Sequence, residues 1–154
     1  MTQTIDARLA ELGIVLPDAP APAANYVPYV TTGDLVFVSG QISRDEAGLI
    51  TGRLGADVDV AAGRAAARHC GLALVAQLRA ACGGDLERVR QVVKLTGFVN
   101  ATPEFTEHPQ VINGISDLMV EIFGDRGRHA RAAVGSVSLP LGVAVEVEGV
   151  FRIA

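Results

Sequence analysis

The chain has 154 residues, of which 49% are hydrophobic and 19% are charged, and its formal net charge is −4. This length suits one domain with a real hydrophobic core, and the apolar content excludes intrinsic disorder. The net charge and the single lysine, Lys94, argue against nucleic acid as the main partner, because phosphate binding needs clustered Lys and Arg. With so few charged residues, a monomer would leave much apolar surface exposed to water, and we expect part of that surface to face another subunit.

Neither membrane insertion nor export is indicated. No apolar run approaches the ~18–20 residues that span a bilayer. Charged residues interrupt residues 1–13, unlike the apolar core of a signal peptide. Cys70 and Cys82 fall in one predicted helix, about 18 Å apart along its axis, and cannot form a disulfide within it. We therefore expect free thiols and a cytoplasmic protein.

The first third of the chain predicts a short helix and a hairpin. The helix covers residues 4–12 and is followed by an extended Pro/Ala-rich arm over residues 17–24. Strands over residues 29–30 and 35–39 flank a Gly-Asp turn. A second glycine-containing turn follows at residues 45–48.

Helices and strands then alternate. The predicted elements are a helix over residues 60–82, a strand over 89–100, a helix over 109–123, and strands over 131–138 and 144–153. Asp57 or Asp59 can cap the first helix, and Pro109 suits the first position of the second. This order predicts an α+β fold in which two helices pack on one face of a mixed sheet. We expect one domain over residues 1–154, with residues 1–24 forming the helix and arm.

No local motif indicates a nucleotide, metal or catalytic-triad site. The glycines form no phosphate-binding loop, and no Gly-x-Ser-x-Gly elbow occurs. His69, His108 and His129 stand far apart, and the cysteines lack metal-ligand spacing. We therefore predict no metal site, with His69 on a helix surface and His108 in a cap or loop.

Two polar features are candidates for a functional site. Arg131 stands at the start of a predicted strand, where a planar guanidinium can bind a carboxylate through two parallel hydrogen bonds. Glu146 and Glu148 share one face of the last strand, and a carboxylate on a buried face is costly unless it is paired or functional. The alternative is a solvated face on which both glutamates are surface residues.

Several segments occur in an order and spacing that resemble the RidA (YjgF-like) family, over residues 24–154. These segments are Val38-Ser39-Gly40-Gln41-Ile42, Arg131 to Val134, Leu139-Pro140, and Val145-Glu146-Val147-Glu148. The resemblance implies a chorismate-mutase-like fold assembled as a homotrimer, with a central barrel and three sites between subunits. It also implies a reactive enamine/imine deaminase that needs no cofactor. Such enzymes detoxify 2-aminoacrylate and related metabolites by hydrolysing them to a 2-keto acid and ammonia.

The same resemblance assigns roles to individual residues. Arg131 would clamp the substrate carboxylate, and Glu146 would orient or activate the attacking water. The remaining residues assigned to substrate binding are Tyr26, Ser39, Gly40, Asn113 and Ala133. Ala133 stands where many members have cysteine, and the Asn113 match requires one extra residue before Arg131.

The chain also departs from the family pattern. Residues 25–29 lack the Gly-Pro that many deaminases have before the tyrosine. An insertion around residues 124–129 adds Arg128 and His129, which either contact a different substrate tail or are solvated. These changes indicate a divergent subgroup. An alternative function is a trimeric regulatory protein that binds a small carboxylate without turnover. The family's older ribonuclease label suits the acidic chain least.

Overall fold

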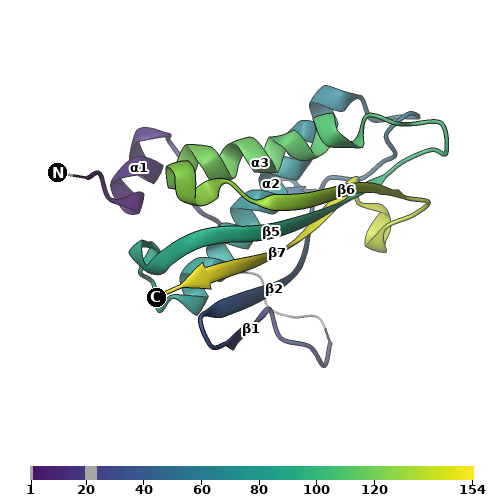
Figure 1. The fold of residues 1–154 in the computed structure, drawn as a ribbon. Helices are drawn as coiled ribbons and strands as arrows, with labels where there is room; N and C mark the ends of the chain where they lie inside the picture. The colour runs from purple at the N-terminus through teal and green to yellow at the C-terminus, as the bar shows by residue number, and fades with distance from the viewer. Residues whose placement is uncertain (1, 20–23) are drawn as a thin grey trace.

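Two helices, α2 (Val60–Ala81) and α3 (His108–Phe123), lie across one face of a five-stranded sheet (Figure 1). The computed structural model describes residues 2–19 and 24–154. The strands, in order across the sheet, are β1 (Tyr29–Thr32), β2 (Leu35–Ile42), β7 (Val145–Ile153), β5 (Val89–Asn100) and β6 (Ala130–Ser136). Among these five strands only β5 and β6 pair in parallel. The predicted α+β fold, with two helices on one face of a mixed sheet, is confirmed.

The smaller elements surround this frame. They are α1 (Ile5–Glu11), the hairpin of β3 (Arg44–Asp45) and β4 (Gly48–Leu49), and the 3₁₀ turns η1 (Leu86–Arg88), η2 (Gly124–Gly127) and η3 (Pro140–Gly142). Thr4 caps α1 by accepting a hydrogen bond from the Ala7 N–H at 3.1 Å, as the predicted start requires. Of the predicted Pro/Ala arm, residues 20–23 lie outside the described part of the chain. No helix in the described part is long and apolar enough to cross a membrane.

The helix ends follow from their capping residues. Asp59 caps α2, since its carboxylate accepts a hydrogen bond from the Ala62 N–H at 2.8 Å. Asp57 instead accepts one from the Arg53 N–H at 2.7 Å. The α3 helix begins at His108, one residue before the predicted Pro109. It ends at Phe123 and is followed by the cap residue Gly124, whose φ of 62° lies in the region that glycine tolerates.

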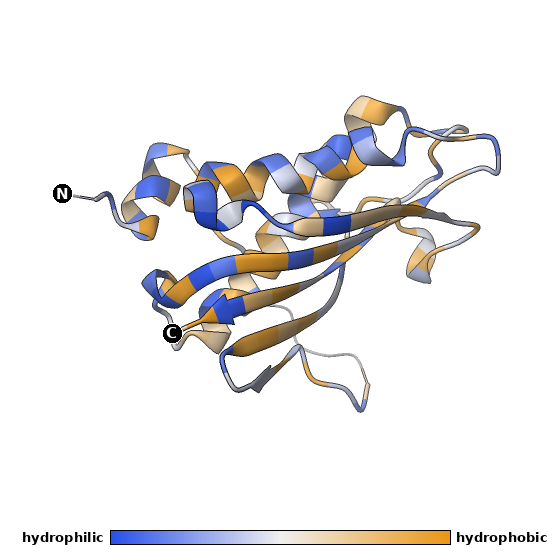
Figure 2. Cartoon of the chain, in the orientation of Figure 1, coloured by the Kyte–Doolittle hydropathy of each residue, from blue (hydrophilic) through white to orange (hydrophobic). Residues whose placement is uncertain are grey.

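The core lies between the helices and the sheet. Hydrophobic and hydrophilic stretches follow one another along β5 (Figure 2), whose pairing with β7 has two register shifts, and β7 alternates residue by residue. Leu74 of α2, Ile115 of α3 and Phe151 of β7 are fully buried there. Each such side chain stabilises the fold by roughly 1.5–3 kcal/mol. The alternation predicted for the last strand is confirmed, with Glu146 and Glu148 on the face opposite the core.

That opposite face of the sheet is open in the single chain and carries apolar side chains. Val30 pairs with Phe37, and Phe37 pairs with Val150, so the three side chains form a continuous row across β1, β2 and β7. Phe37 is 45% exposed and Val30 is 53% exposed. We call Val30, Phe37 and Val150 the apolar stripe.

Candidate functional site

Arg131, at the start of β6, is held against α3 by hydrogen bonds from its guanidinium. Nη1 donates to Asn113 Oδ1 at 2.8 Å and to Ser116 Oγ at 3.1 Å. Nη2 donates a longer bond, at 3.4 Å, to the carbonyl oxygen of Pro109. Asn113 and Ser116 are three positions apart and share a helix face. The structure therefore brings the two predicted residues Arg131 and Asn113 into direct contact.

Ser116 extends this group to His129. The His129 Nε2 lies 2.8 Å from Ser116 Oγ, and its Nδ1 lies 2.6 Å from the carbonyl oxygen of Gly127. We call Arg131, Asn113, Ser116 and His129 the arginine cluster. Sequence reasoning did not identify Ser116; its place one helical turn after Asn113 was the available signal. The neighbouring Arg128 is exposed, and its Nε lies 3.4 Å from Asp125 Oδ1.

Every second residue of β6 faces α3 on the same side as Arg131. Ala133 packs against the core beside this cluster. Two residues further, a Cβ at Gly135 would lie 2.6 Å from His108 Nε2. His108 begins α3, and its ring forms a T-shaped contact with the Phe105 ring, with the ring centroids 5.2 Å apart. The residues at every second position of β6, which are Arg131, Ala133 and Gly135, therefore face the helix layer. This alternation fixes the side of the sheet on which the guanidinium lies.

Glu146 occupies the open face of β7 beside Gly40. The carboxylate fills the space where a side chain at position 40 would lie, since a Cβ there would be 2.5 Å from Glu146 Oε1. The register between β2 and β7 shifts by one residue between Val38 and Gln41. This bulge turns the Gly40 backbone toward the carboxylate. We call Glu146, Gly40 and Ser39 the glutamate cluster.

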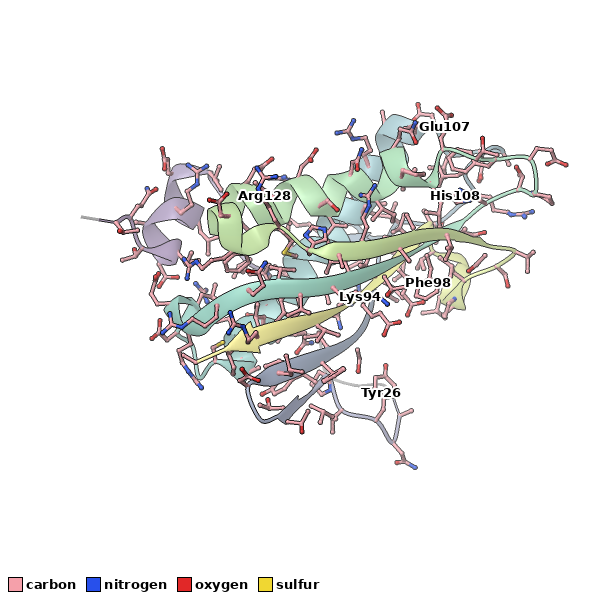
Figure 3. All side chains as sticks on the ribbon, in the orientation of Figure 1. Tyr26, Lys94, Phe98, Glu107, His108 and Arg128 are labelled. Atoms are coloured by element: carbon pink, nitrogen blue, oxygen red, sulfur yellow. The ribbon has the colours of Figure 1, made fainter. Side chains whose placement is uncertain are left out.

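Ser39 ties the glutamate cluster to the segment before β1. Its hydroxyl donates to the Val27 carbonyl at 2.7 Å, and its N–H donates to the Pro28 carbonyl at 2.9 Å. Tyr26 lies on this tied segment with half of its surface exposed. Figure 3 shows Tyr26 on the β1 side of the sheet, while Arg128 lies beside α3.

Burial raises the pKa of the Glu146 carboxyl, and the nearby charge of Glu148 raises it further. A carboxyl with a raised pKa is a stronger base once ionised, which suits proton transfer from water. Burial also raises the pKa of the Cys70 thiol, with Glu146 adding to the effect. Cys70 and Cys82 are both buried and free, as the sequence predicts. The Cys70 thiol therefore stays protonated and is not a nucleophile.

The two clusters lie on different sides of the sheet. Arg131 faces α3 from the edge strand β6. Glu146 faces away from the helices on β7, and β5 separates the two strands. One chain therefore holds the two halves of the predicted site apart.

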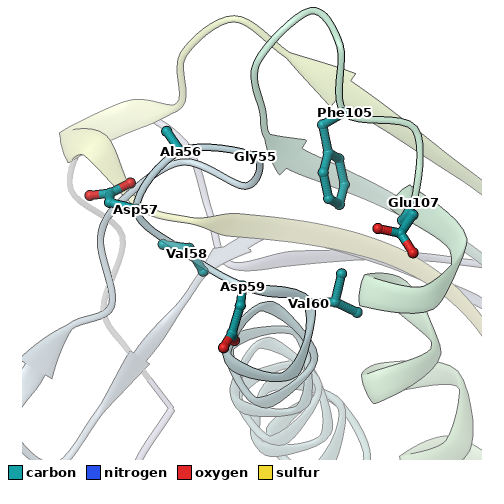
Figure 4. Close-up of a pocket in the computed structure, with 8 residues that line it drawn as sticks. All are labelled: Gly55, Ala56, Asp57, Val58, Asp59, Val60, Phe105 and Glu107. Carbon is teal, nitrogen blue, oxygen red and sulfur yellow. The ribbon is translucent and has the colours of Figure 1, made fainter.

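A cavity of about 460 Å³ lies elsewhere, between the N-terminal ends of α2 and α3 (Figure 4). Its lining includes Phe105, Glu107, Asp57 and Asp59, and none of the residues assigned to the site from the sequence. The Asp57 and Asp59 carboxylates already accept backbone hydrogen bonds. Across residues 2–19 and 24–154, no group of three or more His, Cys, Asp or Glu side chains is placed to hold a metal ion.

Comparison with known proteins gives consistent matches. A family model described as "YjgF/chorismate_mutase-like, putative endoribonuclease" matches residues 6–149. Protein TCP17 of Trypanosoma cruzi is 52% identical over 151 residues, which are 97% of this chain and 94% of that protein. Atu1372 of Agrobacterium tumefaciens, a protein of unknown function, has a structure with a TM-score of 0.90, 47% identity, and coverage of 97% of this chain and 92% of that one. RidA of the Antarctic bacterium Psychrobacter sp. PAMC 21119 has a TM-score of 0.59 and 26% identity, over 88% and 94% of the two chains.

Proposed function

Because the chain belongs to the YjgF/chorismate-mutase-like family, we propose that it is an imine hydrolase. Its substrates are small reactive 2-enamino and 2-imino acids, such as 2-aminoacrylate, and its products are a 2-keto acid and ammonia. The reaction requires a group that holds the substrate carboxylate and a group that accepts a proton from water. Arg131 and Glu146 supply these two chemistries without a cofactor.

The observation that carries the proposal is the unneutralised charge of Arg131. Within the described residues no carboxylate forms an ion pair with it. Its hydrogen-bond partners, Asn113, Ser116 and the Pro109 carbonyl, are all neutral. A held guanidinium that keeps its full positive charge favours an anionic ligand, and its planar donors suit a carboxylate.

Glu146 supports the hydrolytic step. As the oxygen of water adds to the imine carbon, the water gives a proton to the Glu146 carboxylate. The Glu146 carboxyl passes this proton to the imine nitrogen, which gives a carbinolamine. The carbinolamine hydroxyl then gives up its proton, which reaches the nitrogen by the same route as the C–N bond breaks, so that ammonia leaves and the carbon becomes a carbonyl. An imine carbon is already electrophilic, so holding water and substrate in place supplies much of the rate gain.

The placement of the clusters favours a site shared between copies. One chain holds Arg131 and Glu146 on different sides of its sheet, so a second copy must bring its glutamate cluster to the arginine cluster of the first. We propose a homotrimer whose three open sheet faces form a central barrel. The apolar stripe of Val30, Phe37 and Val150 would then be covered, which removes exposed apolar surface from water.

The test is a coupled assay in which 2-aminoacrylate is generated in place and pyruvate formation is followed. Wild-type protein should accelerate pyruvate release, and Arg131→Ala should lose at least about 10-fold in kcat/KM, since hydrogen bonds to a charged group contribute ~1.5–3 kcal/mol. Arg128→Ala, which removes an exposed arginine nearby, should match wild type. Equal pyruvate release with and without wild-type protein overturns the proposal.

A non-catalytic binding protein is the second candidate. It is favoured because the arginine cluster, which would bind the carboxylate, is complete within one chain. Glu146, which would activate water, lies on the other side of the sheet and would have to come from another copy. This candidate predicts that 2-keto acids bind in an Arg131-dependent manner and that no ammonia is released from 2-aminoacrylate.

A further inference from the structure

We propose that His129, acting through Ser116, is a positioning residue that orients Arg131 so that the Nε and Nη2 edge of its guanidinium receives the substrate carboxylate. The inference rests on the proposed function and adds to it the geometry of recognition. It also gives a role to the insertion that separates this chain from the family pattern.

The hydrogen bonds fix the proton positions on His129. A carbonyl oxygen only accepts, so the Nδ1 that lies 2.6 Å from the Gly127 carbonyl carries the proton. In the neutral ring, Nε2 is then an acceptor, and the Ser116 hydroxyl donates to it over 2.8 Å. The oxygen of Ser116 is thereby turned to accept the hydrogen bond from Arg131 Nη1. His129 therefore sets the direction of the Ser116 hydroxyl, and that hydroxyl helps to hold the guanidinium.

The remaining donors of Arg131 define the edge that is available. A guanidinium has five N–H donors. Both hydrogens of Nη1 are used, one by Asn113 and one by Ser116, and Nη2 directs one hydrogen to the Pro109 carbonyl. The Nε–H has no acceptor among the described residues, and Nη2 makes only the long bond, at 3.4 Å, to the Pro109 carbonyl. Nε and Nη2 lie on one edge of the planar guanidinium, and donors on one edge are the arrangement that binds a carboxylate through two hydrogen bonds.

The backbone around His129 is held firmly against α3. Gly127 is buried, and a Cβ there would overlap the Met119 carbonyl of α3, so only glycine allows this approach. The Gly127 carbonyl, which accepts the hydrogen bond from His129 Nδ1, is therefore fixed relative to Ser116. This explains how a residue in the insertion can set the geometry of a helix residue.

The Ser116 and His129 pair also resembles a nucleophile and its base, but the surroundings favour positioning. Ser116 lies in the middle of α3, where backbone N–H groups are used by the helix and none is free to stabilise an oxyanion. The serine oxygen also accepts a hydrogen bond from the Arg131 guanidinium, and this positively charged donor draws electron density from the oxygen and makes it a weaker nucleophile. An acyl-transfer role is therefore disfavoured.

The test measures pyruvate binding by titration calorimetry, together with kcat and KM for pyruvate release. We expect His129→Leu to weaken pyruvate binding and to raise KM by about 10-fold, which corresponds to ~1.4 kcal/mol. The kcat should change little, since Glu146 is in the other cluster. Ser116→Ala should have a similar effect, and the double variant should be no worse than either single variant. His129→Gln keeps an acceptor for the Ser116 hydroxyl and should restore much of the affinity, whereas Arg128→Ala should match wild type.

A spectroscopic signature separates positioning from a general loss of structure. In wild-type protein the Arg131 Nε–H resonance, assigned by its absence in Arg131→Lys, should shift on addition of pyruvate. In His129→Leu the shift should be reduced at equal pyruvate occupancy. If His129→Leu does not fold, Ser116→Ala takes its place as the variant with the reduced shift, and His129→Gln is the variant expected to keep the wild-type shift.

The outcomes distinguish this inference from the proposed function. Unchanged pyruvate affinity and an unchanged Nε–H shift in His129→Leu overturn the inference, while pyruvate release from 2-aminoacrylate would still support the hydrolase. Failure of wild-type protein to bind pyruvate also overturns the inference. A His129-dependent change in affinity without ammonia release supports the inference and rejects hydrolysis in favour of a binding protein.

Discussion

Arg131 and Glu146 lie on opposite sides of one β-sheet, with β5 between the strands that carry them. The arginine points to the helix layer, and the glutamate points to the open face. If the two groups act on one small substrate, as proposed, they cannot meet on it within one chain, because the packed sheet separates them. This relationship links assembly to activity, because a shared site would need the arginine of one copy and the glutamate of another.

Replacing Gly40 by alanine should impair catalysis without unfolding the protein. The added Cβ would lie 2.5 Å from Glu146 Oε1, at the free end of a flexible side chain, so the carboxylate must move. We expect kcat to fall by up to ~10²–10⁴, the usual contribution of a general base. Steady-state kinetics and thermal unfolding measure the two effects. In a Glu146→Gln background, Gly40→Ala should cause little further loss of activity, and a full additional loss would contradict this explanation.

Glu148→Gln should shift the pH dependence of the reaction. Glu148 contributes to the raised pKa of Glu146, and the base must be ionised to act. Removing the Glu148 charge lowers the Glu146 pKa, so the acid limb of the kcat/KM profile should move to lower pH. Glu104→Gln, at an exposed loop position, should leave the limb in place. An acid limb that stays fixed in Glu148→Gln would argue against Glu146 as the base.

Glu146→Gln should stabilise the folded protein at neutral pH while removing activity. The pKa of Glu146 is raised above its ordinary value of 4.5 by burial. The protonated Glu146 carboxyl therefore contributes to the stability of the folded state below pH 4.5, and this contribution is lost as the pH rises through the raised pKa. The Tm of Glu146→Gln should exceed that of wild type at pH 7, and the difference should shrink on acidification. A Tm difference that is independent of pH would contradict this.

Phe37→Asp should disrupt assembly. The aspartate would place a charge in the apolar stripe beside Val30 and Val150, where burial against another copy would cost its solvation. We expect a lower mass by light scattering and a parallel loss of pyruvate release. Val15→Asp, at a residue that is 91% exposed, should retain the wild-type mass. A Phe37→Asp protein with wild-type mass would weaken the barrel proposal.

Gly114→Ala should destabilise the contact between the two long helices. A Cβ at Gly114 would overlap the backbone carbonyl of Arg64 in α2, and backbone cannot yield as a side chain can. Overpacking of this kind costs about 1–3 kcal/mol. At Gly63 the nearest atoms belong to side chains, 3.0 Å and 3.1 Å away, so Gly63→Ala should cost less. Urea unfolding of both variants measures the difference, and an equal cost would contradict the distinction.

The helices and strands were largely predictable because their signals are local. The strand over residues 89–100 matches the structure, and the first long helix ends at Ala81, one residue before its predicted end. The hairpin strands extend to residues 32 and 42, further than predicted, since pairing between strands lengthens them beyond their propensity. The role of Asp59 rather than Asp57 as a cap depends on where the preceding turn places each carboxylate.

The site was predictable in its residue types and not in its arrangement. Arg131 and Glu146 stand out because a charged group beside a buried strand needs a partner or a function. Ser116 did not stand out, because its partners Arg131 and His129 are 15 and 13 residues away in the chain. No spacing rule within one helix relates such residues.

The sequence alone determined the elements and the chemistry that they carry, since periodicity and capping depend on residues within a few positions of one another. Only the tertiary structure decided that β6 pairs in parallel with β5, that Arg131 faces α3, and that Glu146 faces the open side. Sheet order and side-chain partners arise from contacts between distant segments, whose geometry local patterns do not contain.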